Sequence, residues 1–300
     1  MRKGFGLLAA FVLFLGLLPG TAHAATSLGA VVNAAGYGRS ADLNIGEARD
    51  GVALESSAVA FGTALAPFTA SASPATCVQV LAGRSVVLID HRGNRLVACL
   101  TYVSFGQINF YLPRAPFTFL PHDSLLGAVQ IVDSAGVAQA SKALSIRGIT
   151  PGFFSADSSG FGKPAGYVLR VRADGSQAQE PITGWIDLGP PGERVFLVLY
   201  GTGIRLRTPG RNVCLVYGGV VSGGKYRPGR YICGGQVPYA GPAPGLFGGV
   251  DQVNAEIPRD VADARGAEVF IRLFIDDPGQ APAFARWTNV LSVSVSCSTC

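Results

Sequence analysis

Short runs of apolar and β-branched residues, separated by turn-forming residues, follow one another along most of this chain. In the final run, apolar residues alternate with serine, as in a strand with one buried face. No segment keeps a helical period. Strands this short, with glycine and proline between them, predict an all-β protein built of β-sandwiches. The clearest predicted strands cover residues 85–89, 95–102, 129–132, 194–200, 212–217, 268–275 and 289–295.

A seven-residue motif, Gln, aliphatic, Asn, any, any, aliphatic, Pro, occurs twice. Its fixed positions are Gln107, Asn109 and Pro113 in the first copy and Gln252, Asn254 and Pro258 in the second. Upstream, Phe-Gly-Thr at 61–63 matches Tyr-Gly-Thr at 200–202 at nearly the same spacing. Ordered matches at one spacing predict a duplicated domain. We therefore expect two tandem immunoglobulin-like β-sandwiches, at residues 25–148 and 149–296, and a cysteine-containing tail at 297–300.

The first 24 residues have the pattern of a secretory signal peptide. Arg2 and Lys3 precede an apolar run at 5–18, and Ala-His-Ala at 22–24 forms a small-x-small cleavage site. The run is too short for a membrane anchor, since a span needs about 20 apolar residues. No later stretch is long and apolar enough to span. We expect cleavage after Ala24 and a mature protein that is secreted, periplasmic or at the cell surface.

Composition and charge agree with export rather than with nucleic-acid binding. The chain has 40 glycines and 19 prolines among 300 residues, and charged residues make up only 14%. The formal net charge is +5, and loss of the signal peptide lowers it by two. A nucleic-acid partner is not expected, because such proteins gather many cations on one face.

Six cysteines in an exported chain point to disulfides. Six cysteines allow fifteen pairings, and the duplication favours pairs within each repeat. These are Cys77 with Cys99 and Cys214 with Cys233, leaving Cys297 and Cys300 for a local disulfide or a cross-link to another chain.

Several motifs together resemble one known family. They are Val-Asn-Ala-Ala at 32–35, the Phe-Gly-Thr step, Tyr-Val-Ser-Phe-Gly-Gln-Ile-Asn-Phe at 102–110, Pro-Gly-Phe-Phe at 151–154, and the stretch from Tyr239 to Asn254. In this order they resemble the uncharacterised C-terminal domain family of exported proteins first described in Solibacter. Each half also resembles an immunoglobulin-like domain of the IPT/TIG type. The resemblance implies fold and export, and it assigns no activity.

One departure from that family is a long excursion at 220–235, where such domains run short. It contains five cationic or aromatic residues and no acidic residue: Lys225, Tyr226, Arg227, Arg230 and Tyr231. Rings beside cations suit stacking on sugars or holding anionic polymers. We take these five as candidate ligand-binding residues. The alternative is a solvated, protective loop.

Other motifs give weaker candidates. The paired amides of the repeated motif could bind a ligand or could fix the sandwich. Residues 219–225 start like a phosphate-binding loop, but Tyr226 replaces the required Ser or Thr. Two adjacent carboxylates, Asp276 and Asp277, fall short of the ligands that calcium needs. We expect no metal and no cofactor.

The expected function is that of a non-catalytic binding or structural module of the envelope or extracellular space. Its partner would be a polysaccharide or a surface protein. The alternative is a secreted hydrolase acting on an envelope or plant-derived polymer. The mature chain offers only His91 and His122 as imidazole bases, and no Gly-x-Ser-x-Gly elbow.

Overall fold

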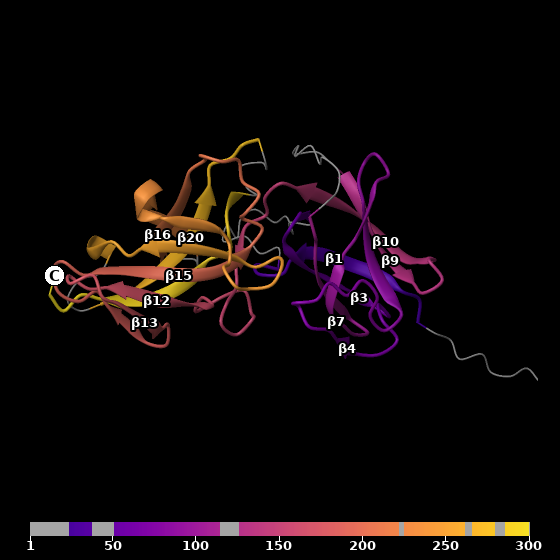
Figure 1. The fold of residues 1–300 in the computed structure, drawn as a ribbon, viewed down its shortest axis with the longest axis horizontal. Helices are drawn as coiled ribbons and strands as arrows, with labels where there is room; N and C mark the ends of the chain where they lie inside the picture. The colour runs from indigo at the N-terminus through magenta and orange to yellow at the C-terminus, as the bar shows by residue number, and fades with distance from the viewer. Residues whose placement is uncertain are drawn as a thin grey trace, which may run out of the picture.

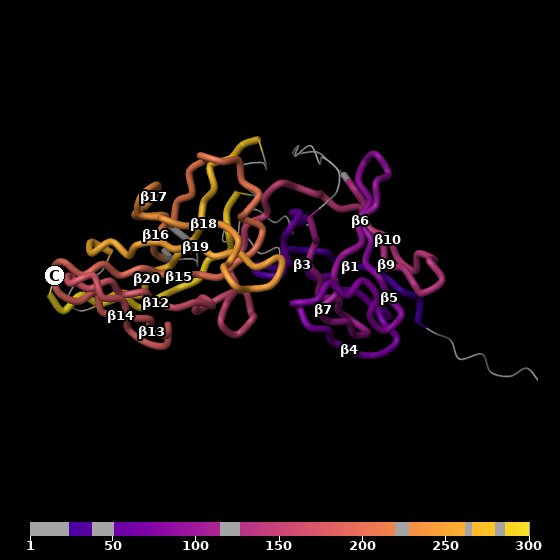
Figure 2. Tube along the Cα trace, viewed as in Figure 1, coloured from indigo at the N-terminus to yellow at the C-terminus, as the bar shows by residue number. Residues whose placement is uncertain are grey.

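The computed structural model describes residues 24–37, 51–114, 126–221, 225–261, 266–279 and 286–299. The all-β prediction is confirmed, because the regular elements of this part are strands and two short 3-10 helices. Figures 1 and 2 show two groups of strands side by side along the long axis. We call residues 24–147 the N-terminal half and 148–299 the C-terminal half.

Two five-stranded sheets form the N-terminal half. One has the order β1-β3-β8-β7-β4 and the other β2-β10-β9-β5-β6. The strands are β1 (Ser27–Asn33), β2 (Gly51–Ala53), β3 (Ser57–Thr63), β4 (Ala70–Ser71), β5 (Arg84–Ile89), β6 (Arg95–Val97), β7 (Cys99–Val103), β8 (Gln107–Tyr111), β9 (Leu126–Asp133) and β10 (Ala138–Arg147).

The C-terminal half also has two sheets. One has the order β13-β12-β15-β19-β18, with β11 paired to β15, and the other β14-β21-β20-β16-β17. The elements are β11 (Gly152–Phe153), β12 (Gly166–Val171), β13 (Gln177–Pro181), β14 (Trp185–Asp187), β15 (Arg194–Thr202), β16 (Val213–Val221), β17 (Lys225–Cys233), η1 (Gly234–Gln236), β18 (Tyr239–Pro242), β19 (Asp251–Glu256), η2 (Arg259–Val261), β20 (Ala267–Ile275) and β21 (Leu291–Ser296).

The repeated motif occupies matching places in the two halves. Gln107 lies opposite Phe61, and Gln252 lies opposite Tyr200. Each half also has one parallel pair, β2 with β10 and β14 with β21, at the same place in the strand order. The strand topology is therefore that of a duplicated unit, while the domain limits at 25–148 and 149–296 stay a prediction.

Each half has its own hydrophobic core between its two sheets. In the N-terminal half, Ile108 and Phe110 of one sheet pack with Val86 and Ile131 of the other. In the C-terminal half the core takes alternate residues of β21, namely Leu291, Val293 and Val295. The serine alternation in this strand thus faces its apolar residues inward, as the sequence predicts. Burial of such side chains, roughly 1.5–3 kcal/mol each, is the main force that holds the sheets together.

One predicted strand is divided between two sheets. Residues 95–102 were expected to form one strand, but β6 ends at Val97 and β7 begins at Cys99. At the crossing, the Ala98 N–H still donates to Val86 O of one sheet, while the Leu100 N–H donates to Val78 O. The continuous apolar run allows this crossing because both segments face the same core.

The disulfides Cys77–Cys99 and Cys214–Cys233 are both present, as predicted. Their places are not equivalent, however. Cys214 and Cys233 face each other across β16 and β17, whereas Cys77 lies in the β4–β5 connection and joins it to β7. The pairing within each repeat is as predicted, and only the second pair joins two adjacent strands of a hairpin. Cys297 is also disulfide-bonded, and Cys300 lies outside the described residues.

Candidate functional site

Most of the described residues of the excursion at 220–235 belong to strands. Strands β16 and β17 pair antiparallel from Cys214 and Cys233 as far as Val221 and Lys225. Gly229 is the extra residue of a bulge, because Tyr217 faces Arg230 while Gly218 faces Pro228. Backbone pairing between β16 and β17 therefore orders the described part of this excursion.

Two of the five candidate binding residues of this hairpin, Arg230 and Tyr231, have described side chains, and these lie on different faces of β17. Arg230 and Tyr231 are neighbours in a strand, so their side chains point to opposite faces. Arg230 lies 3.6 Å from the Asp260 carboxylate of η2, and both side chains are more than half exposed. Tyr231 is 46% exposed. For Lys225, Tyr226 and Arg227 only the backbone, in β17, is described.

Strand β17 lies at the edge of its sheet, and this gives its cations a structural explanation. Exposed edge strands risk pairing with other chains, and proteins protect them with lysine, proline and bulges. β17 carries Lys225, Pro228 and the bulge at Gly229. These features favour the protective reading of the excursion over the binding reading.

The amides of the repeated motif bond to each other within each strand. Gln107 Nε2 donates to Asn109 Oδ1 at 2.6 Å, and Gln252 Nε2 donates to Asn254 Oδ1 at 2.8 Å. The same bond in both halves shows that the motif serves the sandwich. Of the four amides, only Asn109 lines a cavity among the described residues.

The remaining candidates from the sequence are two carboxylates and two histidines. Asp277 is buried and accepts a hydrogen bond from the Thr208 hydroxyl at 3.1 Å, and Asp276 pairs with Arg286 at 3.2 Å. Within the described ranges, no group of His, Cys, Asp or Glu side chains could hold a metal ion. His91 is exposed in the β5–β6 turn, and His122 lies outside the described residues.

One hollow among the described residues is a cleft between the two halves. It has a volume of about 540 Å³. Six aromatic residues line it, three from each half: Tyr37, Phe110, Tyr111, Phe154, Tyr200 and Phe247. Leu246 and Phe247 are 45% and 41% exposed, so the cleft is open to water on this side. Sequence analysis missed this site because its rings come from five separate segments.

Glycines allow two of these rings to pack across the junction. A Cβ on Gly160 would lie 3.2 Å from Tyr37 Cδ2, and one on Gly248 would lie 2.7 Å from Tyr111 Cε2. Each tyrosine of the N-terminal half thus rests on a glycine of the C-terminal half, at a distance that a larger residue would not allow.

Polar groups of the cleft are hydroxyls and one carboxamide. Ser57, Thr101, Ser155 and Ser158 supply the hydroxyls, and Asn109 supplies the carboxamide. Among the described residues that line the cleft, none is Asp, Glu, Lys, Arg or His. Burial raises the pKa of the Tyr200 phenol, with Tyr167 adding to the effect. The Tyr200 phenol therefore stays neutral near pH 7, and the described lining offers a ligand stacking and hydrogen bonds rather than ion pairs.

Buried hydrogen bonds fix the two halves beside the cleft. The Thr202 hydroxyl accepts from the Ser57 N–H at 2.7 Å and donates to Gly249 O, and it is fully buried. Asn33 Nδ2 donates to Thr150 O. Behind the cleft, Arg205 Nε donates to buried Asp251 at 2.6 Å, and Arg205 Nη2 donates to Val250 O. The cleft is thus formed in advance rather than by closure.

A second hollow, of about 370 Å³, lies at the far end of the C-terminal half. Its arginines already have partners: Arg194 binds Glu256 through two bonds of 3.1 and 2.8 Å, and Arg230 faces Asp260. Arg259 donates to the carbonyls of Leu188, Gly189 and Pro190. The paired charges make this hollow a poor site for a charged ligand.

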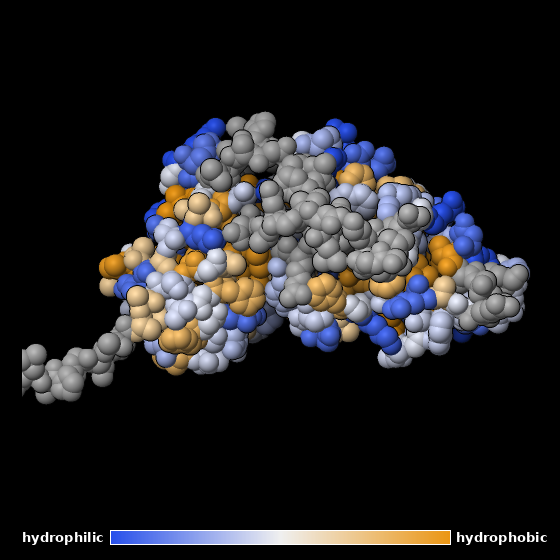
Figure 3. Space-filling model, turned by 180° about the vertical axis from the view of Figure 1, so that it is seen from behind, coloured by the Kyte–Doolittle hydropathy of each residue, from blue (hydrophilic) through white to orange (hydrophobic). Residues whose placement is uncertain are grey.

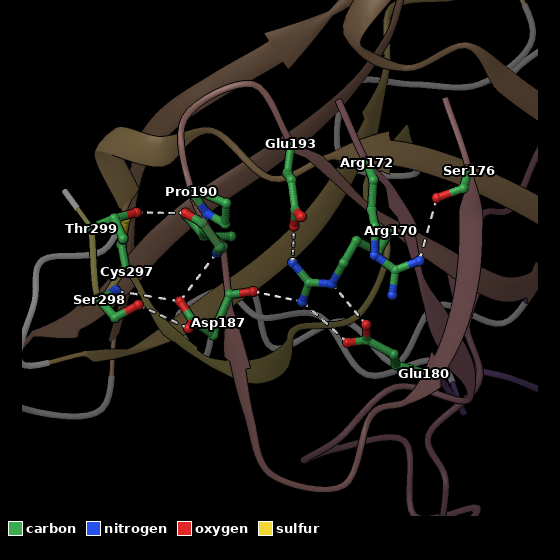
Figure 4. A network of polar contacts seen from close by, with 12 residues as sticks. Arg170, Arg172, Ser176, Glu180, Asp187, Pro190, Glu193, Cys297, Ser298 and Thr299 are labelled. Atoms are coloured by element: carbon green, nitrogen blue, oxygen red, sulfur yellow. Dashed lines mark hydrogen bonds and ion pairs between the residues drawn. The ribbon is translucent and has the colours of Figure 1, made fainter. Parts of the chain in front are cut away.

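The adjacent network in Figure 4 joins the C-terminal segment to the sheets. Arg170 binds Glu180 at 2.7 Å and Glu193 at 3.1 Å, and its Nη2 donates to Asp187 O. Asp187 in turn accepts from the Ser298 hydroxyl at 3.0 Å. These groups satisfy one another, which indicates a structural role.

Figure 3 shows the surface of the molecule from behind the view of Figure 1. Where this face is drawn in colour, hydrophobic residues are dispersed among hydrophilic ones. In the described part of the chain, no helix is long and apolar enough to cross a bilayer.

Comparisons with known proteins add little. No family model matches the chain, and no curated protein does. Among solved structures, a tetra-tandem repeat from the extending region of a large adhesion protein is 12% identical, with a TM-score of 0.20, over 90% of this chain and 73% of that one. The adhesive subunit of the CFA/I fimbria of enterotoxigenic Escherichia coli is 10% identical, with a TM-score of 0.20, over 90% and 93%. Likenesses at this level support no conclusion about function.

Proposed function

We propose that this protein is an exported, non-catalytic binding module that holds a polymer of the cell surface or its surroundings in the cleft between its halves. The observation that carries the proposal is the convergence of six aromatic residues, three from each half, on one open hollow. Ligand sites are typically concave, mostly apolar and fitted with a few polar groups, in the range of about 300–1,000 Å³. The cleft has each of these properties.

Export is supported by the disulfides and by the signal-peptide pattern. Disulfides persist in oxidising compartments and are rare in the cytosol, and two pairs bridge this chain. Membership of the exported family first described in Solibacter is likewise a proposal, and it rests on the ordered motifs alone.

Binding is favoured over hydrolysis by the chemistry of the cleft. Polymer hydrolysis needs a general acid and a base or nucleophile within reach of the scissile bond. The described residues that line the cleft supply neither a carboxylate nor an imidazole. His91, the histidine that the structure describes in the mature chain, does not line it.

The proposal is tested by incubating the mature, oxidised protein with insoluble envelope polymer and with cellulose, chitin and pectin. We expect the protein to sediment with at least one of them and to release no soluble sugar. Release of reducing ends would establish the hydrolase alternative, and absence of binding to every polymer would contradict the proposal. Repeating the assay with Arg230→Ala/Tyr231→Ala separates the hairpin from the cleft, since this variant leaves every cleft residue in place.

A further inference from the structure

We infer that the cleft takes an uncharged carbohydrate chain, whose sugar rings stack on the tyrosine and phenylalanine side chains of both halves. This inference rests on the proposed function and adds to it the chemical class of the ligand and the residues that select it.

The first argument for an uncharged ligand is that the described lining of the cleft carries no charged side chain. A carboxylate or sulfate entering this hollow would lose part of its hydration, and among the described lining residues no cation would replace it. Burying an unpaired charge is costly, whereas burying the apolar face of a neutral ring is favourable. Acidic polysaccharides and nucleic acids are therefore disfavoured.

Aromatic side chains that are already held in place provide the stacking surface. Tyr37 contacts Phe61, with ring centroids 6.2 Å apart, and Tyr200 contacts Tyr167, with centroids 6.5 Å apart. Phe61 and Tyr200 are the matching first residues of the repeated Phe/Tyr-Gly-Thr step. Each half thus contributes a supported ring to the cleft, so that little side-chain entropy is lost when a flat ligand stacks there.

Polar groups beside the rings suit a ligand that is rich in hydroxyls. The Gln107 side chain holds Asn109 Oδ1, so that the Nδ2 donor of Asn109 lies on the opposite side of the carboxamide. Thr101 Oγ1 donates to Asn109 O at 3.2 Å and keeps lone pairs that can accept from a ligand. A sugar has this combination of apolar ring faces and hydroxyl edges, and its outer hydroxyls can stay in water because the cleft is open at Leu246 and Phe247.

An extended apolar peptide is the main competitor. Its rings or prolines would fit the same aromatic surface, as in grooves that bind polyproline segments. The peptide must however satisfy the N–H and C=O groups that its backbone buries, and the strands that border the cleft, β3 and β8, are already paired on both sides. A carbohydrate ligand has no peptide backbone, so it does not bury unpaired N–H and C=O groups.

The test measures by calorimetry the binding of neutral hexasaccharides of β-linked glucose, xylose and N-acetylglucosamine. Polygalacturonate and a proline-rich peptide are measured in the same way and represent the two alternative ligand classes. We expect at least one neutral chain to bind and Phe247→Ala or Tyr200→Ala to weaken it about tenfold or more, the usual effect of removing a central aromatic contact. Tyr231→Ala is the matched control, because it removes an exposed ring outside the cleft. Increasing salt should leave the affinity unchanged, since no charge pairs across the contact.

Three results would overturn the inference. If polygalacturonate or the peptide binds and Phe247→Ala abolishes this binding, the cleft is the binding site but its ligand belongs to another class. Neutral-sugar binding that survives both cleft substitutions would place the site elsewhere. Failure of all three sugars, while wild type still sediments with envelope polymer, would reject the carbohydrate class and leave the proposed function standing. Circular dichroism and a thermal midpoint near wild type confirm that each variant is folded.

Discussion

The Thr202 hydroxyl accepts a hydrogen bond from the Ser57 backbone N–H across the junction of the two halves, at 2.7 Å. Thr202 is the last residue of the second Tyr-Gly-Thr step, and its counterpart in the first half is Thr63. The two threonines have different roles, because Thr202 is fully buried and Thr63 is exposed and pairs with Ser27 in β1. Thr202 thus links the two halves, whereas Thr63 is the last residue of strand β3.

Replacing this buried hydroxyl should destabilise the junction. Thr202→Val leaves the Ser57 N–H without its acceptor and removes one of the two donors to Gly249 O, the other being the Ser57 hydroxyl. Leaving buried polar groups unsatisfied costs about 1–3 kcal/mol, so we expect a loss of this size in the free energy of unfolding, measured with urea. Thr63→Val is the matched control and should change stability by less than about 0.5 kcal/mol. Equal effects of the two variants would contradict a special role for Thr202.

The hairpin disulfide should contribute strongly to stability. Cys214 and Cys233 close a loop with a sequence separation of 19, which corresponds to roughly 3 kcal/mol in the chain-entropy estimate. The variant Cys214→Ala/Cys233→Ala should show this loss in urea unfolding under oxidising conditions. Adding a reductant to the variant should then destabilise it less than it destabilises wild type. Wild-type stability in the double variant would show that strand pairing alone orders β16 and β17.

Acid should weaken the Arg170 network and thereby lower the stability of the C-terminal half. The hydrogen bond from Arg170 lowers the pKa of the Glu180 carboxyl below its usual value of 4.5. Because the folded-state pKa is the lower one, the network stabilises the protein above pH 4.5 and loses this contribution as the pH falls through the folded-state pKa. We expect the thermal midpoint of the wild type to decrease when the pH is lowered below 4.5. Glu180→Gln should have a lower thermal midpoint than wild type at pH 7, and its midpoint should decrease less on acidification. Parallel pH curves for wild type and variant would contradict this role.

Processing should give a mature protein that begins at Ala25. The motivation is the small-x-small sequence at 22–24, which follows a short apolar run. N-terminal sequencing of exported protein should return Ala-Thr-Ser-Leu. A start at Met1 in exported material would exclude cleavage, and Ala22→Leu/Ala24→Leu should block it, since bulky residues do not fit that site.

Sequence alone predicted local structure well wherever one signal dominates. Turn residues at 90–94 and 133–136 predicted the β5–β6 and β9–β10 hairpins, and both are present. The cysteine pairs were predicted because duplication restricts the choices. At 220–235 the sequence showed only an excursion, whereas residues 220–221 and 225–233 belong to β16 and β17. Pairing between these two strands decides the local structure.

The candidate site was beyond reach of the sequence for a related reason. Tyr37, Tyr111, Tyr200 and Phe247 stand in four segments without a shared motif, and any of them could be an ordinary core ring. The cationic excursion drew attention instead because its residues are contiguous, yet Arg230 and Tyr231 point to opposite faces of β17.

Periodicity, turn residues and repetition are local properties of the chain, and they determined that this protein is all-β, that its motif is duplicated, and which cysteines pair. The tertiary structure alone decided which ends of the repeats meet. The long β18–β19 connection, with Gly248 and Gly249, reaches across to Tyr111 and Ser57, whereas the matching β7–β8 turn is tight. Packing between distant segments requires complementary shapes on both sides, and no single stretch of sequence contains that information. For this reason the cleft arises at the junction, where two folded halves meet.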